Sequence, residues 1–196
     1  MVLLNFYEFI DIIFMTVIIG LIFMDFFKIK TPGRKPWTTA LTQKWFNKES
    51  FLTAIMIIAP AIILHEFGHK FVAMSFGLNA SFNAAYGWLI FALILKFVIP
   101  GFIFLVPAYV SISPGATALQ SSTIAFAGPL VNLIIFGAIA LFFIYAKSKK
   151  LQIKRKTMMI LLFTKKVNLF LFIFNMLPIP GFDGFHVFSG LIKILF

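Results

Sequence analysis

Apolar residues form long runs along this chain of 196 residues, and polar residues gather between the runs. Residues 9–27, 51–76 and 121–146 are each long enough, at about 1.5 Å per helical residue, to cross a bilayer. A fourth run, 167–177, is shorter and is followed by a break rich in proline and glycine, NMLPIPGFDG, before apolar residues resume. This pattern predicts several membrane-spanning helices.

Short-range signals mark the ends of some of these helices. Asn47 or Ser50 can cap the second helix, because their side-chain oxygens accept hydrogen bonds from its free N–H groups. Gly77 is expected to end the same helix, since glycine adopts the left-handed conformation of a helix C-terminus without strain. After the basic stretch 147–156, we expect TMMILLFTKK (157–166) to lie along the membrane interface.

Residues 81–115 do not fit a simple crossing. The apolar residues before Pro100 and Gly101 are too few to span a bilayer. The stretch FIFLVPAYVSI that follows is rich in aromatic and β-branched residues but contains Pro107. We therefore predict an all-α polytopic membrane protein of about four to six transmembrane helices, with a re-entrant or partly β segment near residues 81–115.

The composition supports a membrane location and excludes several chemistries. Hydrophobic residues make up 61% of the chain, charged residues only 12%, and the mean hydropathy is +1.03. A soluble domain of this length could not bury so much apolar surface, so we expect a multi-pass protein of the cell (plasma) membrane. The chain has no cysteine, which excludes disulfides, thiolate metal sites and a cysteine nucleophile.

The net charge of +11 comes from basic residues beside the apolar runs, which is typical of loops that contact anionic lipid headgroups rather than nucleic acid. If both basic loops face the cytoplasm, an even number of crossings separates them. Residues 51–76 and 121–146 supply two, so the segment between them should enter and leave on one side. The basic residues concerned are Lys28, Lys30, Arg34, Lys35, Lys44 and Lys48 in the first loop, and those of 147–156 in the second.

The second run contains the sequence HEFGH, an HExxH motif. On a helix, positions i and i+4 share a face, so His65 and His69 can direct nitrogens at one metal ion. Glu66 then lies beside the ion, where it can take a proton from water, and Gly68 allows close approach of backbone or substrate. The alternative, unrelated polar residues hydrogen-bonded to their neighbours, would leave three costly groups in lipid.

A catalytic zinc ion needs a third protein ligand, and the sequence offers few. After Glu66 the only acidic residue is Asp183, which lies in the break between two apolar stretches. His186 is the rival third ligand, and Asp183 can instead cap the last helix. The six acidic residues of the chain are Glu8, Asp11, Asp25, Glu49, Glu66 and Asp183.

The sequences HEFGH, FAGPLVN and NMLPIPGFDG occur in the order seen in the site-2 protease family of intramembrane zinc metalloproteases, which the chain resembles over residues 51–190. The resemblance implies Zn²⁺ as the cofactor, held by His65, His69 and Asp183. It also implies that Glu66 is the general base and that Asn175 holds the substrate strand or its carbonyl. The remaining residues that the resemblance picks out are Gly128, Pro129 and Asn132, expected to shape the helix packing near the site.

The resemblance implies a single integral membrane domain over 1–196, with a first helix and basic loop (1–50) and a catalytic core (51–190). We expect a minimal form of the family, because we see no interposed PDZ-like region and no appended soluble regulatory domain in these residues. The segment 81–115 stands where the family often has a membrane-associated β-hairpin, but it is longer and more apolar. The basic loops suggest that the HEFGH helix runs opposite to the family's usual direction.

The expected substrates are transmembrane-helix proteins, cut by a zinc-activated water. Their helices must unwind locally, and the stretch FIFLVPAYVSI could pair with the unwound strand. Two other functions are consistent with the motif. A metal transporter could use the His/Asp site but would not explain Glu66, and a prenyl-protein-type HExxH protease would need a later glutamate as its third ligand. A binding protein that kept the fold without activity is a third possibility.

Overall fold

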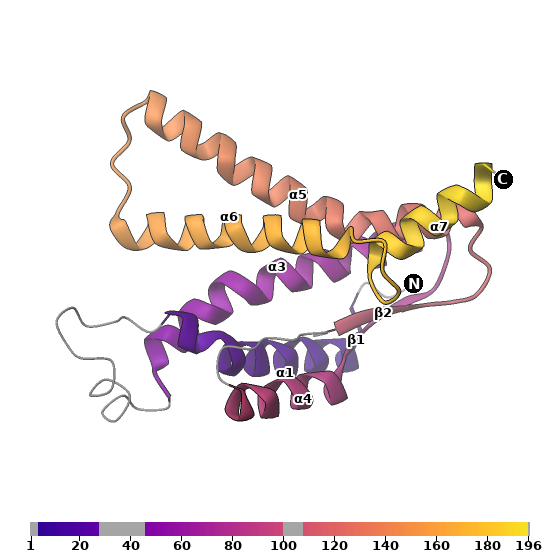
Figure 1. The fold of residues 1–196 in the computed structure, drawn as a ribbon, viewed down its shortest axis with the longest axis horizontal. Helices are drawn as coiled ribbons and strands as arrows, with labels where there is room; N and C mark the ends of the chain where they lie inside the picture. The colour runs from indigo at the N-terminus through magenta and orange to yellow at the C-terminus, as the bar shows by residue number, and fades with distance from the viewer. Residues whose placement is uncertain (1–3, 28–45, 100–107, 196) are drawn as a thin grey trace.

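The computed structural model describes residues 4–27, 46–99 and 108–195, and Figure 1 shows them as a bundle of helices with a small sheet at one end. The elements in chain order are α1 (Phe6–Phe23), the 3-10 helix η1 (Met24–Phe27), α3 (Lys48–Ser75), β1 (Ala80–Ala84), α4 (Tyr86–Val98), β2 (Ala108–Ile112), α5 (Ala118–Ser148), α6 (Arg155–Asn175) and α7 (Asp183–Leu195).

Four helices of the described residues are long and apolar enough to cross a membrane: α1 with η1, α3, α5 and α6. This confirms an all-α polytopic membrane protein. Half of the apolar stretch of α3 is buried inside the protein, against 22% for α5 and 6% for α6. Helix α3 is therefore the centre of the bundle, and α5 and α6 leave most of their apolar surface for lipid.

The prediction for residues 157–177 was wrong in one respect. The expected interfacial segment 157–166 and the short apolar run 167–177 form one continuous helix, α6. Lys165 and Lys166 interrupt the apolar pattern, which is why the sequence suggested two segments. The Lys165 ammonium lies over the rings of Phe136 and Phe143, at 6.0 and 5.7 Å from their centroids, so α5 covers the charge and the helix continues.

The ends of α3 follow the sequence signals. Asn47 is its N-cap and accepts a hydrogen bond from the Ser50 N–H at 2.8 Å. Beyond Ser75, Gly77 has a φ of +80°, and the Leu78 N–H donates to the Ala73 carbonyl at 3.1 Å. This pattern is a Schellman motif, which ends the helix where the glycine was expected to end it.

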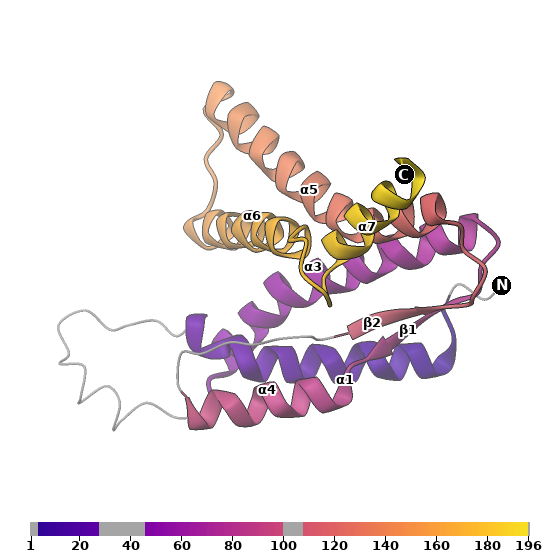
Figure 2. The same ribbon diagram turned by 45° about the vertical axis from the view of Figure 1, so that its right-hand side comes forward.

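The segment between α3 and α5 is partly β, as predicted. Strands β1 and β2 pair antiparallel, with Ala80 opposite Ile112 and Ala84 opposite Ala108. Because Ala80 and Ile112 are neighbours, the chain enters and leaves this segment at the same end of the molecule. Helix α4 lies along α1 (Figure 2), and the first part of FIFLVPAYVSI, 102–107, lies outside the described residues.

The opposite end of the molecule carries the start of α3 and the connection between α5 and α6 (Figure 1). Lys156 of α6 and Glu49 of α3 form an exposed ion pair there, at 3.3 Å. The stretch 147–156 therefore lies on the same side as the beginning of α3. The basic residues of 28–45 lie outside the described residues.

Helix α3 separates two layers (Figures 1 and 2). Helices α1 and α4 and the sheet lie on one side of it, and α5, α6 and α7 lie on the other. The hydrophobic core fills the first layer, between α1, α3, α4 and the sheet. Its buried members are Met15, Ile19, Ile57, Ile58, Ile62, Phe82, Ala84, Leu89 and Ala108.

A buried ion pair fixes the sheet to both α1 and α3. Glu8 and Lys70 contact each other through Oε1 and Nζ, and both side chains are almost fully buried. The same Oε1 accepts the Phe82 N–H at 2.7 Å, and Oε2 accepts the Asn5 N–H at 2.8 Å. One helical turn later, Asp11 accepts the Ala84 N–H at 3.0 Å. The carboxylates of α1 thus accept hydrogen bonds from the N–H groups of β1 that point away from β2.

Candidate metal centre

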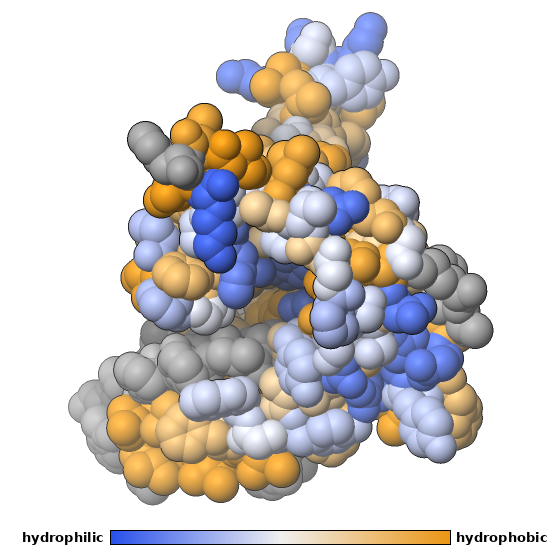
Figure 3. Space-filling view, turned by 90° about the vertical axis from the view of Figure 1, so that its right-hand side faces the viewer, coloured by the Kyte–Doolittle hydropathy of each residue, from blue (hydrophilic) through white to orange (hydrophobic). Residues whose placement is uncertain are grey.

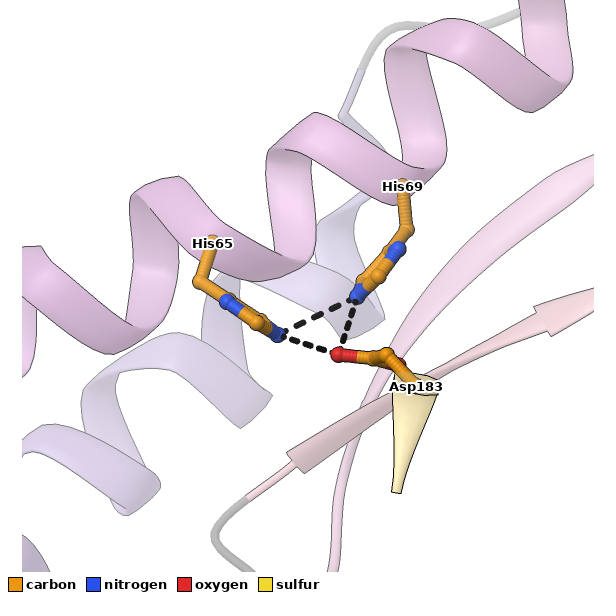
Figure 4. A group of neighbouring side chains, drawn as sticks. All are labelled: His65, His69 and Asp183. Atoms are coloured by element: carbon orange, nitrogen blue, oxygen red, sulfur yellow. Dashed lines mark hydrogen bonds and ion pairs between the residues drawn. The ribbon is translucent and has the colours of Figure 1, made fainter. Parts of the chain in front are cut away.

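The two histidines of the HEFGH sequence lie one helical turn apart on the buried face of α3 (Figure 4). Their Nε2 atoms are 3.1 Å apart. The rings are nearly perpendicular, with an interplanar angle of 83°, so both nitrogens point to one place from different directions. The helix therefore brings two of the three predicted ligands together, as the i and i+4 spacing requires.

Asp183, the first residue of α7, supplies the third donor. Its Oδ2 lies 3.1 Å from Nε2 of His65 and 3.4 Å from Nε2 of His69. His186 is exposed on the same helix and does not belong to this group. The structure thus places Asp183, and not His186, beside the two histidines.

The break before α7 sets the position of Asp183. Helix α6 ends at Asn175, and Gly181 in the break has a φ of +97°, which only glycine adopts without strain. A Cβ at Gly184 would lie 2.6 Å from the Leu177 carbonyl oxygen, so the chain folds tightly back on itself beside Asp183. The two prolines and two glycines of NMLPIPGFDG thus place the carboxylate against α3.

Each histidine is held through its other ring nitrogen. Nδ1 of His65 lies 2.6 Å from Oδ1 of Asn132, and Nδ1 of His69 lies 2.7 Å from the Ile124 carbonyl oxygen. Both partner atoms accept hydrogen bonds, so each Nδ1 carries the proton and donates. The Nε2 atoms are then left with lone pairs, and they face each other and Asp183.

In these tautomers the three atoms are all acceptors, and a cation between them, a proton or a metal ion, removes their mutual repulsion. A tetrahedral ion with bonds of about 2.0 to 2.1 Å holds its ligand atoms about 3.3 Å apart. The separations here are 3.1, 3.1 and 3.4 Å. Two imidazoles and one carboxylate are also typical zinc donors, and three protein ligands leave a fourth position open. The donor set fits a catalytic zinc ion.

Two glycines allow α3 and α5 to approach each other at this centre. A Cβ at Gly68 would lie 2.7 Å from the Ala127 carbonyl oxygen, which confirms the close backbone approach expected at Gly68. A Cβ at Gly128 would lie 2.8 Å from Nε2 of His65 and closer still to Nε2 of His69. Gly128 therefore does more than shape helix packing, because any side chain there would fill the space between the ligands.

The roles predicted for Glu66 and Asn175 stay predictions. Glu66 is buried beside the ligands and interacts electrostatically with all three of them. Asn175 is the last residue of α6 and is half-buried, at the start of the break that leads to Asp183.

Sequence reasoning missed one polar residue. Asn168 of α6 is fully buried, and its Oδ1 accepts a hydrogen bond from Nδ2 of Asn132 at 2.9 Å. Its position within an apolar run was a signal, because amides are costly in lipid unless they are bonded to another helix. For Asn132, the sequence predicted packing, whereas the structure shows direct contact with His65.

The end of the molecule that carries the sheet and α7 is hollowed (Figure 3). Hydrophilic residues gather around the hollow, and hydrophobic residues cover much of the surface below it. A cleft of about 350 Å³ opens at this end, between the C-terminal part of α3 and the open end of the sheet. Its lining is Met74, Asn79, Ala80, Ser81, Ser111, Ile112 and Ser113, and His65, His69 and Asp183 are not among these residues.

Comparison with known proteins agrees with this chemistry. The chain is 34% identical over 141 residues to a protein of Methanocaldococcus jannaschii named "Putative zinc metalloprotease MJ0611", and the match covers 68% of each chain. No protein-family model matches the chain, and no solved structure matches it. With this identity and coverage, and with a donor set that fits zinc, the chain belongs to the zinc metalloprotease family that this name denotes.

Proposed function

We propose that this zinc metalloprotease is of the site-2 type and cleaves peptide bonds within the transmembrane helices of membrane-protein substrates. The observation that carries the proposal is the position of the ligands. His65 and His69 lie in the C-terminal half of α3, a candidate membrane span that other helices surround. A hydrolytic centre on such a helix acts at membrane depth, where substrate helices lie.

The roles of the residues follow from their chemistry. His65, His69 and Asp183 would hold zinc, which supplies a Lewis acid that polarises the scissile carbonyl and acidifies water. Glu66 would take the proton of the attacking water and pass it to the leaving amine. Asn175, next to the break before Asp183, would hold the substrate backbone by its side-chain amide.

A substrate helix must unwind before cleavage, because its carbonyls are engaged within the helix. The sheet offers a partner for the unwound segment. On β1, the N–H groups of Phe82 and Ala84 point outward and are taken by Glu8 and Asp11. An added strand would therefore pair with β2, where Ala108 lies opposite Ala84 and has the same outward orientation.

Cleavage of a defined transmembrane-helix substrate by the purified protein in detergent tests the proposal. We expect cleavage that stops with a zinc chelator, returns with added zinc, and is abolished by Glu66→Gln. The matched control is Glu49→Gln, an exposed carboxylate at the start of the same helix, which should retain full activity. Full activity of Glu66→Gln would refute the mechanism, and cleavage of soluble unfolded peptides alone would refute the substrate class.

Strand addition has a separate test. Val110→Pro removes an outward N–H group of β2, because Val110 lies opposite Phe82, and it spares the buried core residue Ala108. We expect slower cleavage of the helical substrate with unchanged zinc content. Undiminished cleavage would show that β2 does not receive the substrate.

A further inference from the structure

A line of buried amides connects α6 to the metal centre. The side chains of Asn132 on α5 and Asn168 on α6 are both completely buried. Nδ2 of Asn132 donates to Oδ1 of Asn168 at 2.9 Å, and Oδ1 of Asn132 faces Nδ1 of His65 at 2.6 Å. Asn168 therefore lies two hydrogen bonds from Nδ1 of His65 without touching the metal ligands' converging atoms.

Two backbone carbonyls fix the direction of every bond in this line. The Ala61 carbonyl lies 3.0 Å from one end of the Asn132 amide, and that end must be Nδ2, because a carbonyl oxygen only accepts. The Thr164 carbonyl lies 2.8 Å from one end of the Asn168 amide, which is Nδ2 for the same reason. Asn168 therefore presents its oxygen to Asn132.

This direction determines which nitrogen of His65 carries the proton. With its Nδ2 held by two acceptors, Asn132 presents Oδ1 to His65, and Nδ1 of His65 must donate. Nε2 then keeps a free lone pair for metal. If the Asn132 amide were flipped, Nδ2 would face Nδ1, and the proton would move to Nε2, where it blocks metal binding.

We infer that Asn168 is a positioning residue that locks His65 in its metal-binding tautomer, acting through Asn132. Two acceptors oppose the flipped amide: the Ala61 carbonyl belongs to α3, the helix of His65, and Asn168 supplies the side-chain acceptor from α6. Without it, one hydrogen of Nδ2 has no partner in a site closed to water, and the preference of Asn132 for its present orientation weakens. The inference concerns how zinc is held, so it stands independently of which substrate the protease cleaves.

Three variants of the full chain in detergent separate this role from packing. Asn168→Leu has a similar volume but no acceptor. Asn168→Asp, neutral when buried, keeps an oxygen for Asn132 and an O–H for the Thr164 carbonyl. It should therefore keep His65 in the Nδ1–H tautomer. Ser122→Ala is the matched control, because it removes another buried bond of α5, from Ser122 to the Val187 carbonyl, without touching a histidine.

The first readout is the histidine tautomer, measured by ¹⁵N NMR on metal-free protein labelled at histidine. All proteins compared carry Asp183→Ala, because the Asp183 carboxylate would otherwise accept a proton from Nε2 of His65. The chain has only three histidines, and the exposed His186 serves as the internal reference. We expect the Nδ1–H form of His65 with Asp183→Ala alone, and also when Asn168→Asp or Ser122→Ala is added to it. Asn168→Leu should show a substantial share of the Nε2–H form.

The second readout is zinc affinity, measured by competition with a chelator. We expect Asn168→Leu to bind zinc about 10 to 100 times more weakly, the range typical of partners behind a metal ligand, and Asn168→Asp to stay near the unmodified chain. Unchanged affinity in Asn168→Leu would overturn the inference, as would weaker binding with an unchanged tautomer. If Asn168→Leu does not fold, Asn168→Ser, whose hydroxyl is too short to reach Asn132, receives the same two measurements and the same two criteria.

Discussion

Two buried polar clusters lie next to each other on α3, and they are built in opposite ways. His69 belongs to the metal centre, and Lys70, the next residue, belongs to the ion pair with Glu8. The Glu8 cluster pairs a carboxylate with a cation and with two backbone N–H groups. In the metal centre, three acceptor atoms converge. The donors, the Nδ1 atoms of the two histidines, point away from them toward Asn132 and Ile124.

The difference shows how a membrane helix can carry both structure and chemistry. The Glu8 cluster is complete within the chain, so its charges hold α1, α3 and β1 together. The metal centre is complete only when a cation is bound, because its own hydrogen-bond donors are directed at Asn132 and Ile124. Changes in the first cluster should therefore affect folding, and changes in the second should affect zinc binding.

The largest expected effect is that of Asp183→Asn. We expect complete loss of activity and of the rise in melting temperature that zinc gives the unmodified protein. Without zinc, however, the variant should be at least as stable as the unmodified chain, because the new amide can donate to the Nε2 atoms of His65 and His69. Thermal unfolding with and without zinc measures both the stability of the metal-free protein and the rise in melting temperature that zinc causes. A strong loss of metal-free stability would show that Asp183 mainly supports the fold.

Glu8→Gln should have the opposite signature. It leaves the Lys70 ammonium buried without its charge partner, which costs about 3 to 5 kcal/mol of unfolding free energy. Zinc affinity of the folded fraction should be unchanged. The double variant Glu8→Gln/Lys70→Met should recover much of the stability, since neither charge remains. Chemical unfolding and zinc titration of the three proteins check this, and weaker zinc binding by folded Glu8→Gln would contradict the separation of the two clusters.

Gly128→Ala should damage the metal centre from the side of α5. Its methyl group would enter the space between the two Nε2 atoms, so we expect a destabilisation of about 1 to 3 kcal/mol together with reduced zinc binding. Gly137→Ala on the same helix is the matched control, because no atom lies within 4 Å of its added Cβ. Zinc titration and thermal unfolding distinguish them, and equal behaviour of the two variants would refute the close contact.

The smallest expected effect is that of Asp11→Asn. Asp11 accepts from the Ala84 N–H and the Tyr86 hydroxyl, and no ion pair of Asp11 is found within residues 4–27, 46–99 and 108–195. An amide should therefore replace it at a cost below about 1 kcal/mol. The hydrogen bond to Asp11 raises the pKa of Tyr86, and the variant should bring that pKa back toward its ordinary value. A titration followed by tyrosinate absorbance checks the shift, and no difference between the two proteins would argue against this bond.

Some features of the molecule could be predicted because their causes are local in the sequence. The apolar runs, the cap at Asn47 and the glycine end of α3 depend on neighbouring residues only. The spacing of His65 and His69 fixes their common face for the same reason. The sequence also limited the third ligand to Asp183 or His186, because the chain has so few acidic residues and histidines.

The sequence by itself thus determined that the chain is a membrane protein with a two-histidine metal motif, and it limited the third metal ligand to two residues. Only the tertiary structure decided that Asp183, 118 residues from His65, lies against the two histidines and that Asn168 is hydrogen-bonded to Asn132. It also decided that Glu8 pairs with Lys70 and that α6 is one helix. The physical reason is that a hydrogen bond between helices depends on their packing, and hydropathy and spacing along one segment carry no information about which side chain another segment presents to it.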